Sequence, residues 1–126
     1  MKKELFAGIL LTTMITASLF NTYYLTKVTE SMASGVNNAI SYAEQDNWDS
    51  AKKQVKDSEN ELDRHKAYFK TVLEHEKVSS IEGLYSDFSA HIYSSDKADT
   101  VFAGYRLLDY LDYICSSENI SFSSIF

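Results

Sequence analysis

Residues 25–48 read LTKVTESMASGVNNAISYAEQDNW, and they contain the pattern that decides the fold. Their apolar residues recur at every third or fourth position, which describes one face of an α-helix. These are Leu25, Val28, Met32, Val36, Ile40 and Ala43. Asp46 and Asn47 follow, and because such residues suit a turn and a helix N-cap, we expect the helix to end there.

An apolar segment precedes this helix, and nothing between Phe20 and Leu25 would stop the two from forming one continuous helix. Lys2 and Lys3 stand before a run from Leu5 to Phe20 that only Thr and Ser interrupt. This layout is typical of a secretory signal, either a cleaved peptide or a retained anchor. Extended to Leu25, the helix is long enough for the roughly 30 Å hydrocarbon core of a membrane.

The sequence therefore divides into a signal anchor or signal peptide over residues 1–26 and a helical-bundle domain over residues 27–126. We expect contact with the membrane through Leu5 to Leu25. Because basic residues favour the cytoplasmic side, the N-terminus is predicted to be cytoplasmic and the domain extracytoplasmic. The protein is then a single-pass protein of the cell membrane, or a secreted one if the segment is cleaved.

The next apolar stripe keeps its spacing over three heptads and predicts a helix of about 30 residues. It consists of Trp48, Ala51, Val55, Ser58, Leu62, His65, Phe69 and Val72. Ser79 and Glu82 then form a capping box, which predicts a new helix start. The apolar face behind it contains Ile81, Leu84, Tyr85, Phe88 and Ile92.

Ser94-Ser95-Asp96 predicts the next break, followed by a last helix. Its expected apolar side consists of Ala98, Val101, Phe102, Tyr105, Leu108, Leu111 and Cys115. Residues 116–126 are either a strap packed over the bundle or a frayed tail. With no Pro, four Gly and almost no alternating pattern, the chain is predicted to be all-α. We expect an N-terminal membrane or signal helix followed by an antiparallel bundle of about four helices, arranged as two helical hairpins.

Composition excludes several functions. A net charge of −6 disfavours a nucleic-acid binder that works through phosphate contacts. The one cysteine, Cys115, cannot form an internal disulfide, and His65, His75 and His91 do not stand at metal-ligand spacing. No nucleophile motif or phosphate-binding loop is present. We expect no enzyme activity, no metal and no cofactor.

Two motifs are specific enough to compare with known families. Asp46-Asn47-Trp48 with Ala51 resembles a Gly-Asp-Trp-x-x-Ala turn, and residues 69–82 (FKTVLEHEKVSSIE) resemble a run of aromatic, aliphatic, His, aliphatic and Ile-Glu residues. The matching positions of that run are His75, Val78, Ile81 and Glu82. Proteins with these motifs tend to have further tryptophans at two positions, where this chain has Leu62 and Phe69. This difference does not affect the expected fold.

These motifs are similar to those of a bacterial family of small, N-terminally anchored helical proteins, known as domain of unknown function 4363. The likeness covers nearly the whole chain. It implies an extracytoplasmic helical domain of Gram-positive, often spore-forming bacteria, with no assigned activity. We assign structural roles to the core and turn residues Trp48, Ala51, Leu62, Phe69, His75 and Ile81. We expect His75 to lie near the C-terminal end of the helix predicted to begin at Trp48, where a protonated imidazole interacts favourably with the helix dipole.

The last helix provides the functional hypothesis. Asp109 and Asp112 are one turn apart, with Tyr110 and Tyr113 beside them. Aromatic residues combined with negative charge suit a basic partner segment near the membrane. We therefore expect a non-enzymatic, membrane-anchored interaction or adaptor domain with a protein partner in or near the membrane. The alternative is a secreted helical bundle that binds a small ligand or a metal after signal cleavage.

Overall fold

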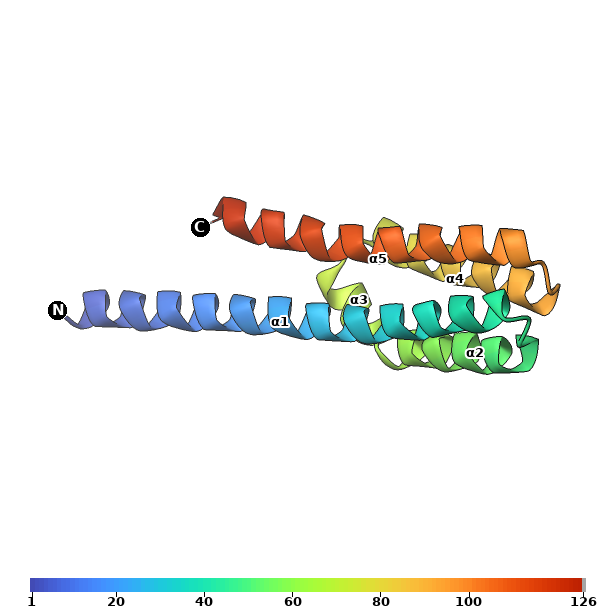
Figure 1. Ribbon diagram of the computed structural model, residues 1–126. Coiled ribbons are helices and arrows are strands. Elements are labelled where there is room, and N and C mark those ends of the chain that lie inside the picture. Colours follow the sequence, from blue (N-terminus) through green and yellow to red (C-terminus); the bar gives the residue numbers. More distant parts are fainter. Residues whose placement is uncertain (126) are drawn as a thin grey trace.

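The computed structural model describes residues 1–125, with side chains as far as Glu118. This part of the chain forms five helices and no strand (Figure 1). They are α1 (Lys2–Glu44), α2 (Trp48–Arg64), α3 (Lys66–Val72), α4 (His75–Tyr93) and α5 (Lys97–Ile125). The all-α fold predicted from the sequence is confirmed.

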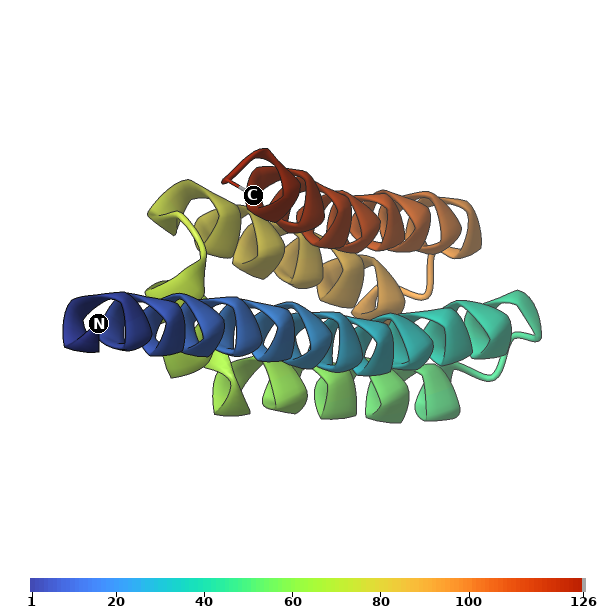
Figure 2. The same cartoon turned by 90° about the vertical axis from the view of Figure 1, so that its left-hand side faces the viewer.

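The helices form two antiparallel hairpins, α1–α2 and α4–α5, as predicted. α1 packs against α2 and α5, and α5 packs in turn against α4. The short α3 joins the hairpins by crossing one end of the bundle (Figures 1 and 2). At that same end α1 leaves the bundle and runs on to the N-terminus, and the last turns of α5 also extend past α3 in this direction. The bundle therefore has a near end at α3, and a far end where the tight turns of both hairpins lie.

The first helix is continuous from Lys2 to Glu44, as the sequence predicts. All six predicted positions of its inner face are buried, and Thr29 and Ala39 join them. Before Leu25 none of its residues is buried, and Phe6 and Phe20 are 69% and 68% exposed. Of the helices that the structure describes, α1 is the one long and apolar enough to cross a membrane.

Both far-end turns have the same construction. Asp46 and Ser95 adopt positive φ angles of 60° and 56°, the left-handed conformation that commonly follows a helix. The Asn47 and Asp96 amides donate back to the carbonyls of Tyr42 and His91, at 2.8 and 3.2 Å.

The same two residues then cap the next helices. The Asn47 side chain accepts from the Ser50 amide at 3.4 Å, and Asp96 accepts from the Asp99 amide at 3.1 Å. The breaks predicted at Asp46-Asn47 and at residues 94–96 are thus confirmed.

The predicted 30-residue second helix is wrong, because the helix is interrupted at His65. The imidazole Nδ1 of His65 donates to the Glu61 carbonyl at 2.9 Å, and α3 then leaves in a new direction. This direction brings Phe69 and Leu73 into the core, with 1% and 6% of their surfaces exposed. Tertiary packing therefore overrides a helical period that continues unbroken in the sequence.

The predicted capping box of Ser79 and Glu82 is also wrong. The chain turns earlier, at the extended residues Leu73 and Glu74, so α4 begins at His75. Ser79 lies one turn inside α4, where it is exposed. His75 is exposed at the start of α4 and not at the end of a long second helix. A protonated imidazole there would meet the unfavourable end of the helix dipole, so the predicted dipole contact is wrong.

The inner face of α5 is rotated relative to the prediction. Its buried residues are Thr100, Ala103, Gly104, Leu107, Leu111 and Ile114. Phe102 and Tyr105 were expected inside but are 65% and 52% exposed. The backbone of α5 continues as helix to Ile125, so residues 116–125 are part of this helix. The prediction of packing or fraying for side chains 119–126 lies outside the described residues.

Gly104 explains this rotation, because it allows α5 to approach α1 and α4 closely. A Cβ atom at Gly104 would lie 2.6 Å from Ile40 Cγ1 and 2.9 Å from Phe88 Cε1. Both of these side chains are buried in the core. A larger residue at position 104 could not face inward without separating the helices.

Replacing Gly104 tests this close packing. We expect Gly104→Ala to lower the free energy of unfolding by about 1–3 kcal/mol, as for an overpacked core. The matched control is Gly83→Ala in α4, where a Cβ atom would meet nothing within 4 Å. Because alanine is the better helix former, that variant should gain up to about 1 kcal/mol. Denaturant unfolding measures both. Equal effects of the two substitutions would contradict the packing.

Candidate functional site

A shallow groove lies along the outer side of the second hairpin, between α4 and α5. It consists of two adjoining hollows of about 310 and 460 Å³, which share Leu84, Arg106 and Tyr110 as lining residues. Asp109 and Tyr113 line the first hollow, and Asp87 lines the second. Three of the four residues predicted to bind a partner therefore line one surface.

The aromatic part of this groove is formed by Tyr110 and Tyr113, whose ring centroids are 5.7 Å apart. Lys77 of α4 lies over the Tyr113 ring at 6.0 Å, and its Nζ forms an ion pair with Glu118 at 3.1 Å. Burial alone would lower the pKa of Lys77, but the hydrogen bond and charge of Glu118 outweigh it and raise the pKa. Lys77 is thus held by Glu118 beside Tyr113.

The fourth predicted residue, Asp112, does not line the groove. Its charge acts instead on the half-buried Cys115, whose thiol lies beside the hydroxyls of Thr26 and Thr29 on α1. Burial raises the pKa of this thiol, and the carboxylates of Asp112 and Glu30 add to the effect. Asp109 therefore lines the groove, whereas Asp112 lies near Cys115, although the two residues are one turn apart in the sequence.

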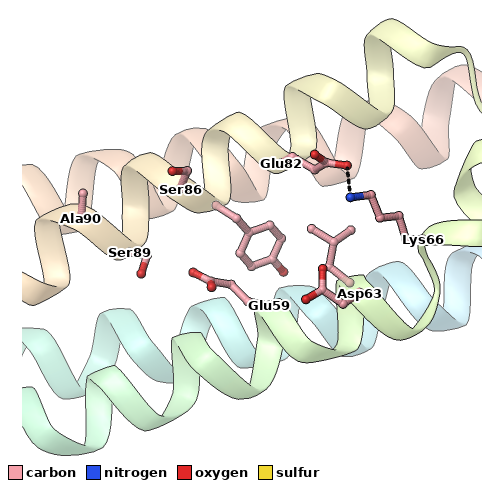
Figure 3. Close-up of a pocket in the computed structure, with 9 residues that line it drawn as sticks. Glu59, Asp63, Lys66, Glu82, Ser86, Ser89 and Ala90 are labelled. Atoms are coloured by element: carbon pink, nitrogen blue, oxygen red, sulfur yellow. Dashed lines mark ion pairs between the residues drawn. The ribbon is translucent and has the colours of Figure 1, made fainter.

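A separate cleft, of about 420 Å³, lies between α2 and α4 and was not predicted (Figure 3). Its α2 side presents Glu59 and Asp63, and its α4 side presents the small residues Ser86, Ser89 and Ala90. At one end Lys66 Nζ and Glu82 Oε1 form an ion pair at 3.3 Å. The sequence contained one signal for this cleft: side chains too small to fill the space occur at three nearby positions of α4.

The inner wall of this cleft includes Leu62 and Tyr85. The Ser58 hydroxyl donates to the Met32 carbonyl at 3.2 Å, so the Tyr85 hydroxyl donates to Ser58, at 2.6 Å. Burial raises the pKa of Tyr85 well above its ordinary value. The tyrosine is therefore held as a neutral hydrogen-bond donor and is not available as a base.

The charges of the cleft determine what it can accept. Glu59, Asp63 and Glu82 contribute three carboxylates, against the one ammonium of Lys66. The Oε1 atom of Glu59 is buried and has no hydrogen-bond partner among the described residues. The lining is thus suited to a cationic group.

The histidines and the cysteine are placed apart. His65 is half-buried, 6.1 Å from the Tyr24 ring, His75 is exposed, and His91 lies 3.5 Å from Asp87. Within the part of the chain that the structure describes, no three His, Cys, Asp or Glu side chains are grouped closely enough to hold a metal ion.

The residues assigned structural roles fall into three environments. Ala51, Leu62, Phe69 and Ile81 are buried in the core. Trp48 is half-buried at the start of α2, where it packs against the core. His75 is exposed at the start of α4.

The fold and its surfaces define a class of protein: a helical bundle with two hairpins and a projecting apolar helix. Within this class the chain belongs to the family described as domain of unknown function 4363, whose family model matches residues 19–125. This match confirms the resemblance found in the sequence. No curated protein and no solved structure matches the chain.

The buried hydroxyl of Tyr85 leads to a prediction. Tyr85→Phe should lower the free energy of unfolding by about 1 kcal/mol at neutral pH, because Ser58 loses a donor. Below about pH 10 the Tyr85 hydroxyl is neutral in both the folded and the unfolded state, so its full contribution to stability is present. Above about pH 10 the hydroxyl ionises in the unfolded state but not in the folded state, and this contribution is lost as the pH rises. The difference between wild type and Tyr85→Phe should therefore shrink above about pH 10.

Urea unfolding at pH 7, 9 and 11 measures this difference. The exposed Tyr105, changed to Phe, is the control and should match wild type at each pH. A wild-type advantage over Tyr85→Phe that is constant between pH 7 and 11 would contradict the buried, neutral hydroxyl.

Proposed function

We propose that this protein is a non-enzymatic interaction domain held on the extracytoplasmic side of a membrane by α1. The observation that supports this proposal is the exposure of the first part of α1. Large apolar side chains such as Leu5, Phe6 and Leu11 are more than half exposed. Such a long apolar surface is costly in water and is removed from it by a bilayer.

The ends of the apolar segment support the orientation. Lys2 and Lys3 precede it, and basic residues favour the cytoplasmic side. Tyr23 and Tyr24 follow it at the level where amphipathic rings favour the membrane interface. The bundle of α2–α5, together with the second half of α1, then lies outside the membrane.

Cysteine labelling in intact cells tests both anchoring and orientation. In a Cys115→Ser background, Asn60→Cys on the exposed side of α2 should react with a membrane-impermeant thiol reagent. Lys3→Cys should react only after lysis. The protein should also stay with the membrane fraction at high pH. Labelling of position 3 in place of position 60 would overturn the orientation, and release from the membrane would overturn the anchor.

The α4–α5 groove is the surface that we propose for a partner. It combines the aromatic surfaces of Tyr110 and Tyr113 with the carboxylates of Asp87 and Asp109. Its basic groups are Arg106 and Lys77, and Lys77 is paired with Glu118. Aromatic residues supply most of the binding energy in many interfaces, and complementary charge selects the partner. The chemistry suits a basic segment with one or more apolar side chains.

Charge reversal separates partner binding from solubility. With a photoreactive residue at position 113, crosslinking in native membranes should capture a protein, and Asp109→Lys should abolish the product. Asp112→Lys is the matched control, because Asp112 does not line the groove, and it should leave the product unchanged. Both are exposed and should change stability by no more than about 0.5 kcal/mol. Equal yields from the two variants would show that the groove is not the docking site.

A second function is favoured by the α2–α4 cleft. After signal cleavage, a released bundle would bind a small cationic ligand between Glu59, Asp63 and Glu82. Mass spectrometry of the mature N-terminus distinguishes the two functions. Retention of residues 1–20 favours the anchored interaction domain, and their removal favours the released form.

A further inference from the structure

Two elements form the near end of the bundle: α3, and the last turns of α5, whose backbone continues past α3 toward the side of the N-terminus (Figure 1). The seven-residue α3 lies across the near end of the bundle, where α1 leaves it (Figures 1 and 2). Phe69 and Leu73 point into the core, so the opposite side of α3 faces away from the bundle. Ala67, Lys70 and Thr71 are exposed on that side.

Direct contacts fix the level of α3 along α1. The Tyr68 hydroxyl donates to the side-chain oxygen of Asn21 at 2.6 Å and lies 3.2 Å from the Asn21 carbonyl. The rings of Tyr24 and Tyr68 meet edge to face, with centroids 4.7 Å apart. An apolar span that begins at Leu5 needs about 20 residues to cross the hydrocarbon core, and so ends between Asn21 and Tyr24. α3 is therefore attached to α1 at the level of the lipid headgroups.

The charges of α3 favour such a location. The helix contains two lysines and no acidic residue, and Arg64, the last residue of α2, stands two positions before it. Lys66 forms an ion pair with Glu82, whereas Arg64 and Lys70 are exposed and have no carboxylate within 4 Å among the described side chains. Ala67 and Thr71 are small, and the Thr71 hydroxyl donates to the Ala67 carbonyl at 2.9 Å. The outer side can therefore approach a surface closely, with cationic groups beside it.

We propose that α3 is a second membrane contact, whose outer side rests on the headgroups of the membrane that α1 crosses. Arg64 and Lys70 bind the phosphate groups of anionic lipids, and Tyr68 links this contact to α1. This inference rests on the proposed membrane anchoring. Anionic headgroups attract such basic residues, and this attraction holds the bundle in one orientation on its anchor.

Tryptophan quenching in vesicles tests the contact on the full-length chain. The vesicles contain phosphatidylglycerol with brominated acyl chains, which quench tryptophans close to the membrane. The native Trp48 lies at the far end of the bundle and should keep its emission. In a Trp48→Phe background, Leu10→Trp should be quenched strongly and Ala67→Trp partly. Arg64→Gln with Lys70→Gln should then reduce the quenching at position 67.

The outcomes separate the two proposals. Unquenched Leu10→Trp would overturn the membrane span itself. Quenching at position 10 without quenching at position 67 would overturn the contact of α3 while leaving the span intact. The matched control is Lys53→Gln with Lys56→Gln, two exposed lysines of α2 that should leave the quenching at position 67 unchanged. If the Arg64 and Lys70 variants also leave it unchanged, binding to headgroup phosphate is wrong.

Discussion

The close approach of α2 to α1 is the constraint on which the rest of the bundle depends. A Cβ atom at Gly35 would lie 3.1 Å from the Cβ of Ser58, so the two helices pack with almost no space between them. At this separation Ser58 reaches the Met32 carbonyl, and Tyr85 of α4 reaches Ser58. One chain of hydrogen bonds therefore crosses three helices inside the core, where an unmade hydrogen bond would cost about 1–3 kcal/mol. It fixes the register of α4 against the first hairpin, and the tight turn at Ser95 transmits that register to α5.

Local signals predicted much of the fold, and the errors occurred where contacts distant in sequence decide. The inner face of α1 and the two far-end turns follow from periodicity and turn-forming residues, which act over a few neighbouring positions. The break at His65 has no such signal, because it arises from the burial of Phe69 under the near end of the bundle. The face of α5 was mispredicted because large aromatic residues were expected inside. Its actual contact surface uses Thr100 and Gly104, small residues whose value depends on Ile40 and Phe88 across the interface.

The candidate site could also be predicted only where the positions depend on local spacing. Asp109, Tyr110 and Tyr113 lie together because they share the outer side of one helix, a property of spacing alone. Asp112 is as close in sequence but does not line the groove, and its charge acts on Cys115, whose thiol lies beside α1. The cleft between α2 and α4 could not be predicted, because it requires knowing which helix lies opposite the small residues of α4. The residues that one helix contributes to a surface can be found from their spacing, whereas the helix that completes the surface cannot.

The apolar half of α1 and the α4–α5 groove lie on different parts of the chain. α1 is unbroken over 43 residues, about 65 Å, so the orientation of its apolar half determines the orientation of the first hairpin. The α4–α5 groove lies on the second hairpin, which contacts α1 chiefly through the inner face of α5. The hairpins are also joined at their surfaces, by Lys97 and Asp46 at the far end, 3.1 Å apart, and by α3 at the near end. The exposed Lys97–Asp46 pair contributes less than about 1 kcal/mol, so the core and α3 must hold the groove in place. The direction of the groove relative to the apolar half of α1 is therefore set by the unbroken α1 helix and maintained by α3.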